Sequence, residues 1–549
     1  MAPKIRAAGL AAALLTAVGL SLPSDTAAIA RPVEPAGARA ADGAGRLSRQ
    51  DMAAAATLRA ALNEARARRA AGARAYRDRL ADPAARKLVD WAIVDVMADE
   101  MSVTELERAI VTFDGWPREA SRRKALERAR LRQRSGPVPY AALARDGAGQ
   151  QAADFRARRL RMIAALRRGD AGAAYRAIAG HGQTPGTVAY AEGEAFAGWL
   201  ALNKLGKPDL ADRHFARLEA AVKSPVSKAR AAYWRGRVAE TRGDRAGAKR
   251  FYEQGAVHST TFYGQLAAEK AGRREIVLDK DPVPSARDRR RFEQAEMTRV
   301  LRLLAAADER RLLRVFGVHY GRSVETRTEL ALLVDELQAL GEQEVSLLAY
   351  RRGAQNGLIL HERGYPLAKP PATAGGVEPA LVLAVVRQES QFDPRVRSPA
   401  DARGMMQILP STGRRVARDL GMTWSDQLLW NPEANMRLGS RYLGQLSRRF
   451  EDSYLLAAAG YNAGPRRPPD WIGFCGDPRV SRTDPLDFIE CIPFGETRNY
   501  VMKIMANYQV YRARLNGGRA TLTAARSLRR VQAPGDPQGS PATRVATSG

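Results

Sequence analysis

Apolar residues recur every three or four positions along most of the chain, which is the spacing of amphipathic helices. From about residue 49 to residue 365 such segments follow one another. They are rich in Ala and Arg, and strand-like alternation is scarce. Asp82-Pro83 has the form of a helix start, and Ser102 to Glu105 has the form of a capping box. The pattern therefore predicts a mostly α-helical fold.

Two stretches of this helical region are alike. Each contains an aromatic residue, a glycine and a second aromatic residue: Trp199, Gly206 and Phe215 in the first, and Trp234, Gly243 and Tyr252 in the second. The offset of 35 to 37 residues is close to the helix-turn-helix repeat of tetratricopeptide (TPR) proteins, and stacked repeats of this kind form a curved solenoid. We therefore expect a TPR-like superhelix with a core of aromatic residues. The alternative is a chance likeness between Ala-rich helices.

The first thirty residues have the three-part layout of a secretory signal peptide. Lys4 and Arg6 precede an uncharged apolar run over residues 7–22, and small residues follow up to Ala30. The run is short for a bilayer span of about 20 residues, so an uncleaved anchor is the less favoured interpretation. We expect an exported, periplasmic protein with no integral membrane segment. Residues 31–48 read as a flexible leader, and residues 516–549 as a largely disordered tail.

The 549 residues suit about three to four domains, and 88 Lys+Arg against 59 Asp+Glu give a net charge of +29. The charge fits either solvated Arg-rich helix faces or attraction to a polyanion, such as nucleic acid, an anionic membrane or an acidic cell wall. Export argues against a nucleic-acid partner.

Cysteine and histidine limit the possible chemistry. Two cysteines cannot form a four-thiolate zinc site, and the five histidines end at His361, so catalysis in the last third of the chain cannot use His. Cys475 and Cys491 would meet an oxidising compartment after export, and we expect them to pair. We expect no metal ion and no cofactor.

A Pro/Gly/Ala-rich segment over residues 366–377 marks a domain boundary, and the candidate chemistry follows it. Glu378-Pro379 opens a helix that is apolar nearly all round and runs to Glu389. Burial and the negative end of the helix dipole should both raise the pKa of Glu389, as a general acid requires. The plainer alternative is a Glu paired with Arg387 or Arg395.

Four motifs in the last third of the chain favour the general-acid interpretation of Glu389 over the arginine-paired one. Glu389-Ser390 is followed by residues 391–394 (QFDP), 404–410 (GMMQILP), 461–464 (YNAG) and 492–501 (IPFGETRNYV). In this order and spacing the motifs resemble the soluble lytic murein transglycosylases. The resemblance implies an α-superhelical ring or solenoid over residues 49–280, a helical linker domain over 281–370, and a catalytic domain like goose-type lysozyme over 371–515.

The resemblance also implies a reaction, the non-hydrolytic cleavage of the MurNAc–GlcNAc β-1,4 bond of peptidoglycan strands. Glu389 would protonate the glycosidic oxygen and then, as a base, activate the MurNAc C6 hydroxyl, which attacks C1 and leaves a 1,6-anhydro sugar. Residues at matching positions would bind the substrate: Tyr461, Asn462, Glu496 and Tyr500. The chemistry of Ser390, Met406 and Gln407 suits them to bind it as well. For some of these, other roles stay open: Ser390 could only cap the helix, Met406 could belong to the core, and Tyr461 could hydrogen-bond Glu389.

Further alternatives remain. Arg498 is as well suited to a salt bridge as to a ligand. A lysozyme-type hydrolase would need a second carboxylate, for which Asp393 and Asp401 are nearest in sequence. A scaffold with an inactive lysozyme-like domain is the third function considered. The segment 466–491, which holds both cysteines, has no counterpart in the resemblance.

Overall fold

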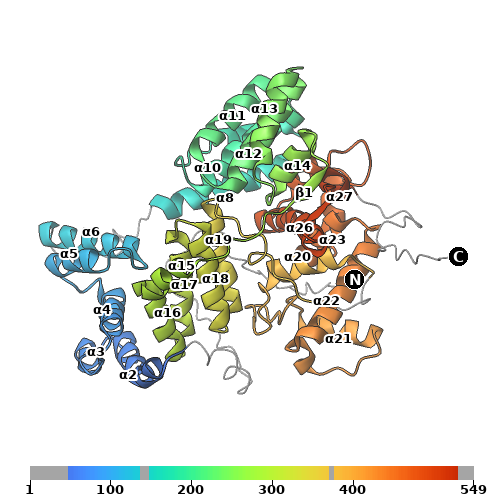
Figure 1. Ribbon diagram of the computed structural model, residues 1–549. Coiled ribbons are helices and arrows are strands. Elements are labelled where there is room, and N and C mark those ends of the chain that lie inside the picture. Colours follow the sequence, from blue (N-terminus) through green and yellow to red (C-terminus); the bar gives the residue numbers. More distant parts are fainter. Residues whose placement is uncertain (1–46, 136–146, 370–375, 530–549) are drawn as a thin grey trace, which may run out of the picture.

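The computed structural model describes residues 47–135, 147–369 and 376–529. The predicted signal peptide, nearly all of the leader and the end of the tail lie outside these ranges. Within them the fold is built almost wholly from helices (Figure 1). No helix of the described ranges combines the length and the hydropathy that crossing a bilayer requires.

The helices of the N-terminal half occupy the left and the top of Figure 1. The predicted helix starts are confirmed, because Asp82 caps α4 and Ser102 forms a capping box with Glu105 at the start of α5. The elements are α2 (Arg49–Arg66), α3 (Ala70–Arg77), α4 (Pro83–Met97), α5 (Val103–Thr112), α6 (Glu119–Ser135), α8 (Gly147–Arg167), α9 (Ala171–Ala179), α10 (Val188–Trp199), the π-helix η1 (Leu200–Lys204), α11 (Pro208–Ala221), α12 (Pro225–Thr241), α13 (Arg245–Ala256) and α14 (Phe262–Lys270).

The two like stretches fold as neighbouring helix pairs, α10–α11 and α12–α13. In each pair a glycine of the first helix lies against an aromatic ring of the second: Gly198 against Phe215, and Gly236 against Tyr252. A Cβ on either glycine would lie well under 3 Å from that ring, so only glycine allows the close approach. The aromatic residues are buried, and Phe215 stacks on Trp234. They therefore form the core of this region, as predicted.

Five helices follow in the centre of Figure 1: α15 (Ala286–Gln294), α16 (Glu296–Ala306), α17 (Arg310–Ser323), α18 (Arg327–Ala339) and α19 (Gln343–Gln355). They pack against the start of the chain as well as against one another. Phe316 of α17 contacts the rings of Trp91 and Trp116, and Arg299 of α16 pairs with Asp82. The first helices are thus fixed to the middle of the chain.

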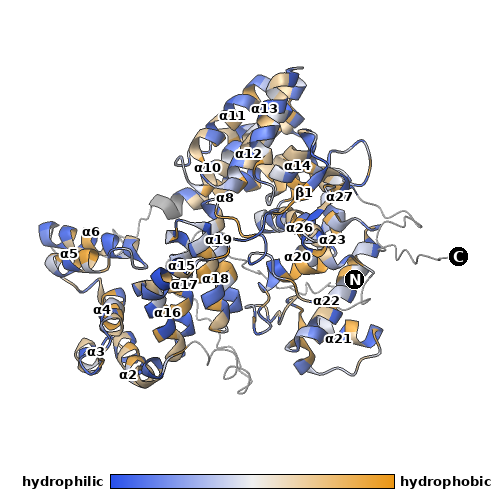
Figure 2. Cartoon of the chain, in the orientation of Figure 1, coloured by the Kyte–Doolittle hydropathy of each residue, from blue (hydrophilic) through white to orange (hydrophobic). Residues whose placement is uncertain are grey.

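The last third of the chain forms the right-hand part of Figure 1. Its elements are α20 (Pro379–Glu389), α21 (Pro410–Asp419), the 3-10 helix η2 (Asp426–Leu429), α22 (Pro432–Arg449), α23 (Tyr454–Ala463), α24 (Arg467–Cys475), α25 (Pro485–Cys491) and α26 (Gly495–Leu515). Residues 380–386 of α20 are all buried, as predicted, and α20 packs on α26. Figure 2 shows α20 as mostly apolar ribbon and α26 as a mixture of apolar and hydrophilic residues.

The prediction of a largely disordered tail is wrong for residues 516–529. Strand β2 (Arg519–Thr521) pairs antiparallel with β1 (Glu275–Val277), and α27 (Ala524–Leu528) follows. Ile276 and Ala520 face each other and are buried, as are Leu522 and Leu528. A three-residue strand is too short to show a period of two, and the few apolar residues of this segment become buried only against distant parts of the chain, namely β1, α14, α23 and α26.

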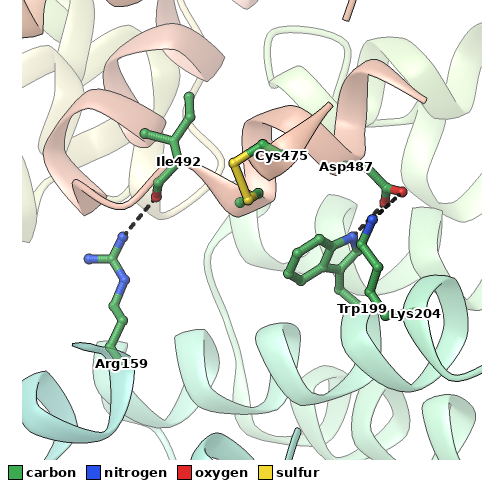
Figure 3. Close-up of a disulfide and its surroundings, with 7 residues drawn as sticks. Arg159, Trp199, Lys204, Cys475, Asp487 and Ile492 are labelled. Carbon is green, nitrogen blue, oxygen red and sulfur yellow. Dashed lines mark hydrogen bonds and ion pairs between the residues drawn. A yellow bond between two sulfur atoms is a disulfide. The ribbon is translucent and has the colours of Figure 1, made fainter. Parts of the chain in front are cut away.

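The segment 466–491 folds into α24 and α25, which a disulfide between Cys475 and Cys491 joins (Figure 3). The two helices dock on the N-terminal helical half. Asp487 accepts hydrogen bonds from the Trp199 indole at 2.8 Å and from Lys204 at 2.9 Å. The segment therefore connects the two halves of the molecule.

Removal of the disulfide should weaken the connection that the segment 466–491 makes between the two halves. We expect Cys475→Ser with Cys491→Ser to lower the stability of the C-terminal domain by about 3 kcal/mol, the loop-closure value for a ring of this size. The thermal unfolding midpoint with and without reductant checks the expectation. Reductant should lower the midpoint of the wild type and leave that of the double variant unchanged. Equal midpoints for the wild type in both conditions would contradict it.

Candidate active site

Helix α20 carries Glu389 at its last position, as the sequence predicts. Pro379 stands in the first turn, and the apolar body of the helix fixes it inside the domain. After Ser390, the backbones of Gln391 and Phe392 take positive φ values of 55° and 65°. Two consecutive side chains in the left-handed region turn the chain sharply away from the helix, and such strain is concentrated at functional sites. Glu389 is thereby left at an abrupt helix end.

Ser390 stabilises this turn. Its hydroxyl donates to the Val386 carbonyl and accepts from the Phe392 amide at 3.1 Å, and the residue is buried. Of the roles open from the sequence, the contacts of Ser390 match the capping role.

Glu389 is half-buried and receives a hydrogen bond from the Tyr500 hydroxyl at 2.7 Å. Burial raises the pKa of Glu389 to about 7; the Tyr500 bond lowers it and the charge of Glu496 raises it. The alternative pairing with arginine does not occur. Arg387 donates to the Gly364 carbonyl and lies over the Tyr365 ring, and Arg395 pairs with Asp393. Glu389 is therefore a carboxyl poised between its acid and base forms near neutral pH.

Tyr461 lies beside this site but bonds elsewhere. Its hydroxyl donates to the Met406 carbonyl at 2.7 Å, and the hydrogen bond to Glu389 that was one possibility for Tyr461 is made by Tyr500 instead. The negative charge of Glu389 still acts on Tyr461, because it contributes to a raised pKa of that hydroxyl, after burial. The difference arises because Tyr461 reaches over to the loop of the second motif.

That loop is held from within. Met406 is fully buried, and its side chain fills the space above Gly439, so its contacts are those of a core residue. Gln407 has a positive φ of 48°, and its side-chain amide donates to the carbonyls of Val396 and Gly404. In this structure the Gln407 amide N–H groups therefore stabilise the loop.

The third motif forms the end of helix α23. Ser453 caps α23, and the helix continues through Tyr461 and Asn462 until Gly464, where φ is 87°. The apolar run before Tyr461 is long enough to extend the helix to the motif. Asn462 accepts a hydrogen bond from Thr497 at 2.7 Å. This contact ties the third motif to the fourth.

Both carboxylates considered for a hydrolase are engaged in ion pairs. Asp393 is buried between Arg310 and Arg395, and Asp401 lies between Arg397 and Arg403. The arginines hold the pKa of both carboxyls below the ordinary value, against the effect of burial. The carboxylate whose charge raises the pKa of Glu389 is Glu496. The sequence predicted Glu496 only as a substrate-binding residue.

Sequence reasoning missed Asn435 of α22. This fully buried side chain accepts from the Met406 amide at 2.8 Å and donates to the carbonyls of Arg403 and Leu429. A polar residue in line with the apolar face of a predicted helix is the one signal that could have found it. The described residues contain no group of three His, Cys, Asp or Glu side chains arranged for a metal ion.

The site is a half-buried glutamate at the end of an apolar helix, inside a helical domain, as a glycosidic-bond-cleaving class of enzyme would require of its general acid. More narrowly, residues 366–477 match the transglycosylase SLT domain, and residues 491–519 match the soluble lytic transglycosylase helical domain. The resemblance to the soluble lytic murein transglycosylases is thereby confirmed.

Individual relatives agree with this. The soluble lytic murein transglycosylase of Escherichia coli K12 is 30% identical over 312 residues, which are 53% of this chain and 45% of the relative. A putative soluble lytic murein transglycosylase of Haemophilus influenzae is 37% identical over 137 residues, 25% of this chain and 22% of the relative. The matches thus span less than half of these curated relatives.

The fold has a solved counterpart. The structure of an inactive Glu-to-Gln mutant of lytic transglycosylase Slt from Pseudomonas aeruginosa superimposes with a TM-score of 0.53 at 22% identity, covering 86% of this chain and 74% of that chain. The overall helical fold is therefore shared with that structure.

Proposed function

We propose that this protein is a lytic transglycosylase of peptidoglycan, with Glu389 as acid and then base. The main support for this proposal is that Glu389 is half-buried at the end of an apolar helix and that its pKa is raised to about 7. A carboxyl of this kind is substantially protonated near neutral pH and can give its proton to the glycosidic oxygen. The carboxylate so formed then takes the proton of the MurNAc C6 hydroxyl, which closes the 1,6-anhydro ring on C1.

One carboxyl suffices for this reaction, since the substrate supplies the nucleophile. A glycosidase that uses water or a covalent intermediate needs a second free carboxylate. The ion pairs of Asp393 and Asp401 support the one-carboxyl reaction. Glu496 is the residue on which the hydrolytic alternative would depend.

Mass spectrometry of the soluble products from purified peptidoglycan sacculi tests the proposal. Anhydro-MurNAc ends are expected from the wild type. Reducing ends would indicate a hydrolase and would direct attention to Glu496. Absence of any product would favour the scaffold with an inactive domain.

The pH profile should show the acid role of Glu389. Its protonated form starts the reaction, so kcat/KM should be high below the pKa and should fall as the pH rises through about 7. Tyr500→Phe removes a bond that lowers this pKa, so the falling limb should move to higher pH. Rates of soluble product release across the pH range measure both limbs. A variant limb at the wild-type position would contradict the assignment.

The basic charge has a natural partner in the carboxylates of peptidoglycan stem peptides. Four arginines of α8, α9 and the turn between them line a cavity of about 460 Å³: Arg158, Arg161, Arg168 and Arg176. We expect sacculus binding by the chain to weaken as ionic strength rises, because salt screens exposed charges beyond about 10 Å at 0.1 M. Co-sedimentation with sacculi at low and high salt measures the effect. Binding that is insensitive to salt would contradict it. Such a substrate also places the protein outside the cytoplasmic membrane, in line with the proposed export.

A further inference from the structure

A buried ion network lies beneath the first turn of α26, on the side away from Glu389. Its centre is Arg498, which is fully buried. The Arg498 guanidinium donates to Glu490 of α25 at 3.1 Å and to Glu192 of α10, and it lies over the Phe196 ring at 4.5 Å. Of the two roles considered for Arg498, this is the salt bridge, and it reaches outside the catalytic domain.

The rest of the network comes from the N-terminal helical half. Arg230 of α12 donates to Glu192 at 3.0 Å and to Glu490 at 2.6 Å. Tyr263 of α14 donates its hydroxyl to Glu490, a carboxylate with no exposed surface. Two arginines and two glutamates therefore neutralise one another across the junction.

A third arginine fixes the backbone at the same place. Arg159 of α8 donates to the Ile492 carbonyl at 3.3 Å, as Figure 3 shows. It also covers Gly495, the first residue of α26, where a Cβ would lie 2.5 Å from the guanidinium. Helices α8 and α10 thus contact the start of α26 directly, and α12 and α14 reach it through Glu490 of α25.

The opposite side of this helix turn serves the candidate active site. Tyr500 lies two residues after Arg498 and donates to Glu389, and Glu496 lies two residues before Arg498 and acts on the same carboxyl. Three titratable groups interact with Glu389: Tyr500 and Glu496 of α26, and Tyr461 of α23. Two of these three groups are therefore carried by the turn that the network holds.

We propose that Glu192, Arg230 and Tyr263 of the helical half are positioning residues for the reaction, because through Arg498 and Glu490 they fix Tyr500 and Glu496 against Glu389. The inference rests on the proposed function. Each carboxylate and guanidinium of this network has a partner of opposite charge, and removal of one partner would leave a buried charge uncompensated, so the pairs favour one arrangement. Catalytic groups need support of this kind, since a displacement of about 1 Å can cost about 100-fold in rate.

The test uses the full chain with Glu192→Gln, which keeps the size of the side chain and removes the charge shared by Arg230 and Arg498. Glu219→Gln is the matched control, since Glu219 pairs with Arg235 on the same helical half but away from the network. We expect Glu192→Gln to lower kcat about tenfold and to move the falling pH limb in the same direction as Tyr500→Phe does, because Tyr500 affects the pKa of Glu389 more than Glu496 does. Glu219→Gln should leave both unchanged.

A loss that is only structural would reduce the amount of active protein without moving the pH limb. A wild-type limb in Glu192→Gln, at equal thermal midpoint, would overturn the inference. If Glu192→Gln does not fold, Tyr263→Phe, which removes one hydroxyl from the network, takes its place with the same criterion. Failure of the proposed function has a different mark, since Glu389→Gln would then retain activity or the wild type would give no anhydro ends.

Discussion

Glu389→Gln should abolish the release of anhydro-muropeptides from sacculi, with a fall of about a thousandfold or more in kcat. General acid–base catalysis by one group contributes about 10² to 10⁴, and here the same carboxyl performs both proton transfers. Glutamine keeps the size and still accepts the Tyr500 hydrogen bond, so the fold and sacculus binding should be retained. Quantitative mass spectrometry of the products, together with co-sedimentation, measures the two effects separately.

Glu433→Gln provides the control for this experiment. Glu433 is an exposed glutamate in the first turn of α22, outside the four motifs, and its loss should leave product release near the wild-type rate. Full activity of Glu389→Gln, with anhydro ends, would refute the assignment of the acid. Reducing ends from the wild type would refute the reaction.

Glu490→Leu should produce the largest loss of stability among the single changes considered. The carboxylate has no exposed surface and accepts hydrogen bonds from Arg230, Tyr263 and Arg498. Leucine fills a similar volume but leaves these donors without their acceptor. Removal of one partner of a buried ion pair costs about 3–5 kcal/mol. A lowered thermal unfolding midpoint, followed by circular dichroism, is the expected result.

The matched change is Glu219→Leu, which breaks a partly exposed pair with Arg235 and should cost about 1 kcal/mol or less. Adding Arg230→Met to Glu490→Leu should be less damaging than the sum of the two single changes, since neighbours in one network are not additive. Equal midpoints for Glu490→Leu and Glu219→Leu would contradict the buried network.

Local sequence signals predicted the helices well, and also the place of Glu389 at the end of an apolar helix. The caps at Asp82 and Ser102 and the apolar run before Glu389 depend on neighbouring residues alone, and the structure agrees. The residue that donates a hydrogen bond to Glu389 was harder to predict from the sequence. Tyr461 and Tyr500 both carry a hydroxyl and both lie within one of the motifs. Which hydroxyl reaches the carboxyl depends on how α23 and α26 pack.

Contacts between distant segments could not be predicted at all. No single-sequence pattern relates Arg498 to Glu192, or β1 to β2, because each pair forms only once the two halves meet. The same applies to Met406 and Gln407. Their residue types suit a sugar as well as a loop, and only the structure shows the contacts with Gly439, Val396 and Gly404.

The small β ribbon has a consequence for the order of events during synthesis. Strand β1 closes the N-terminal helical half, yet its partner β2 lies after the whole catalytic domain. A chain that emerges from the ribosome or a translocation channel therefore holds an open strand edge, with Arg230 and Glu192 still lacking Glu490 and Arg498. The helical half acquires its last contacts only when the catalytic domain is complete, so maturation of the two halves is a single, late event.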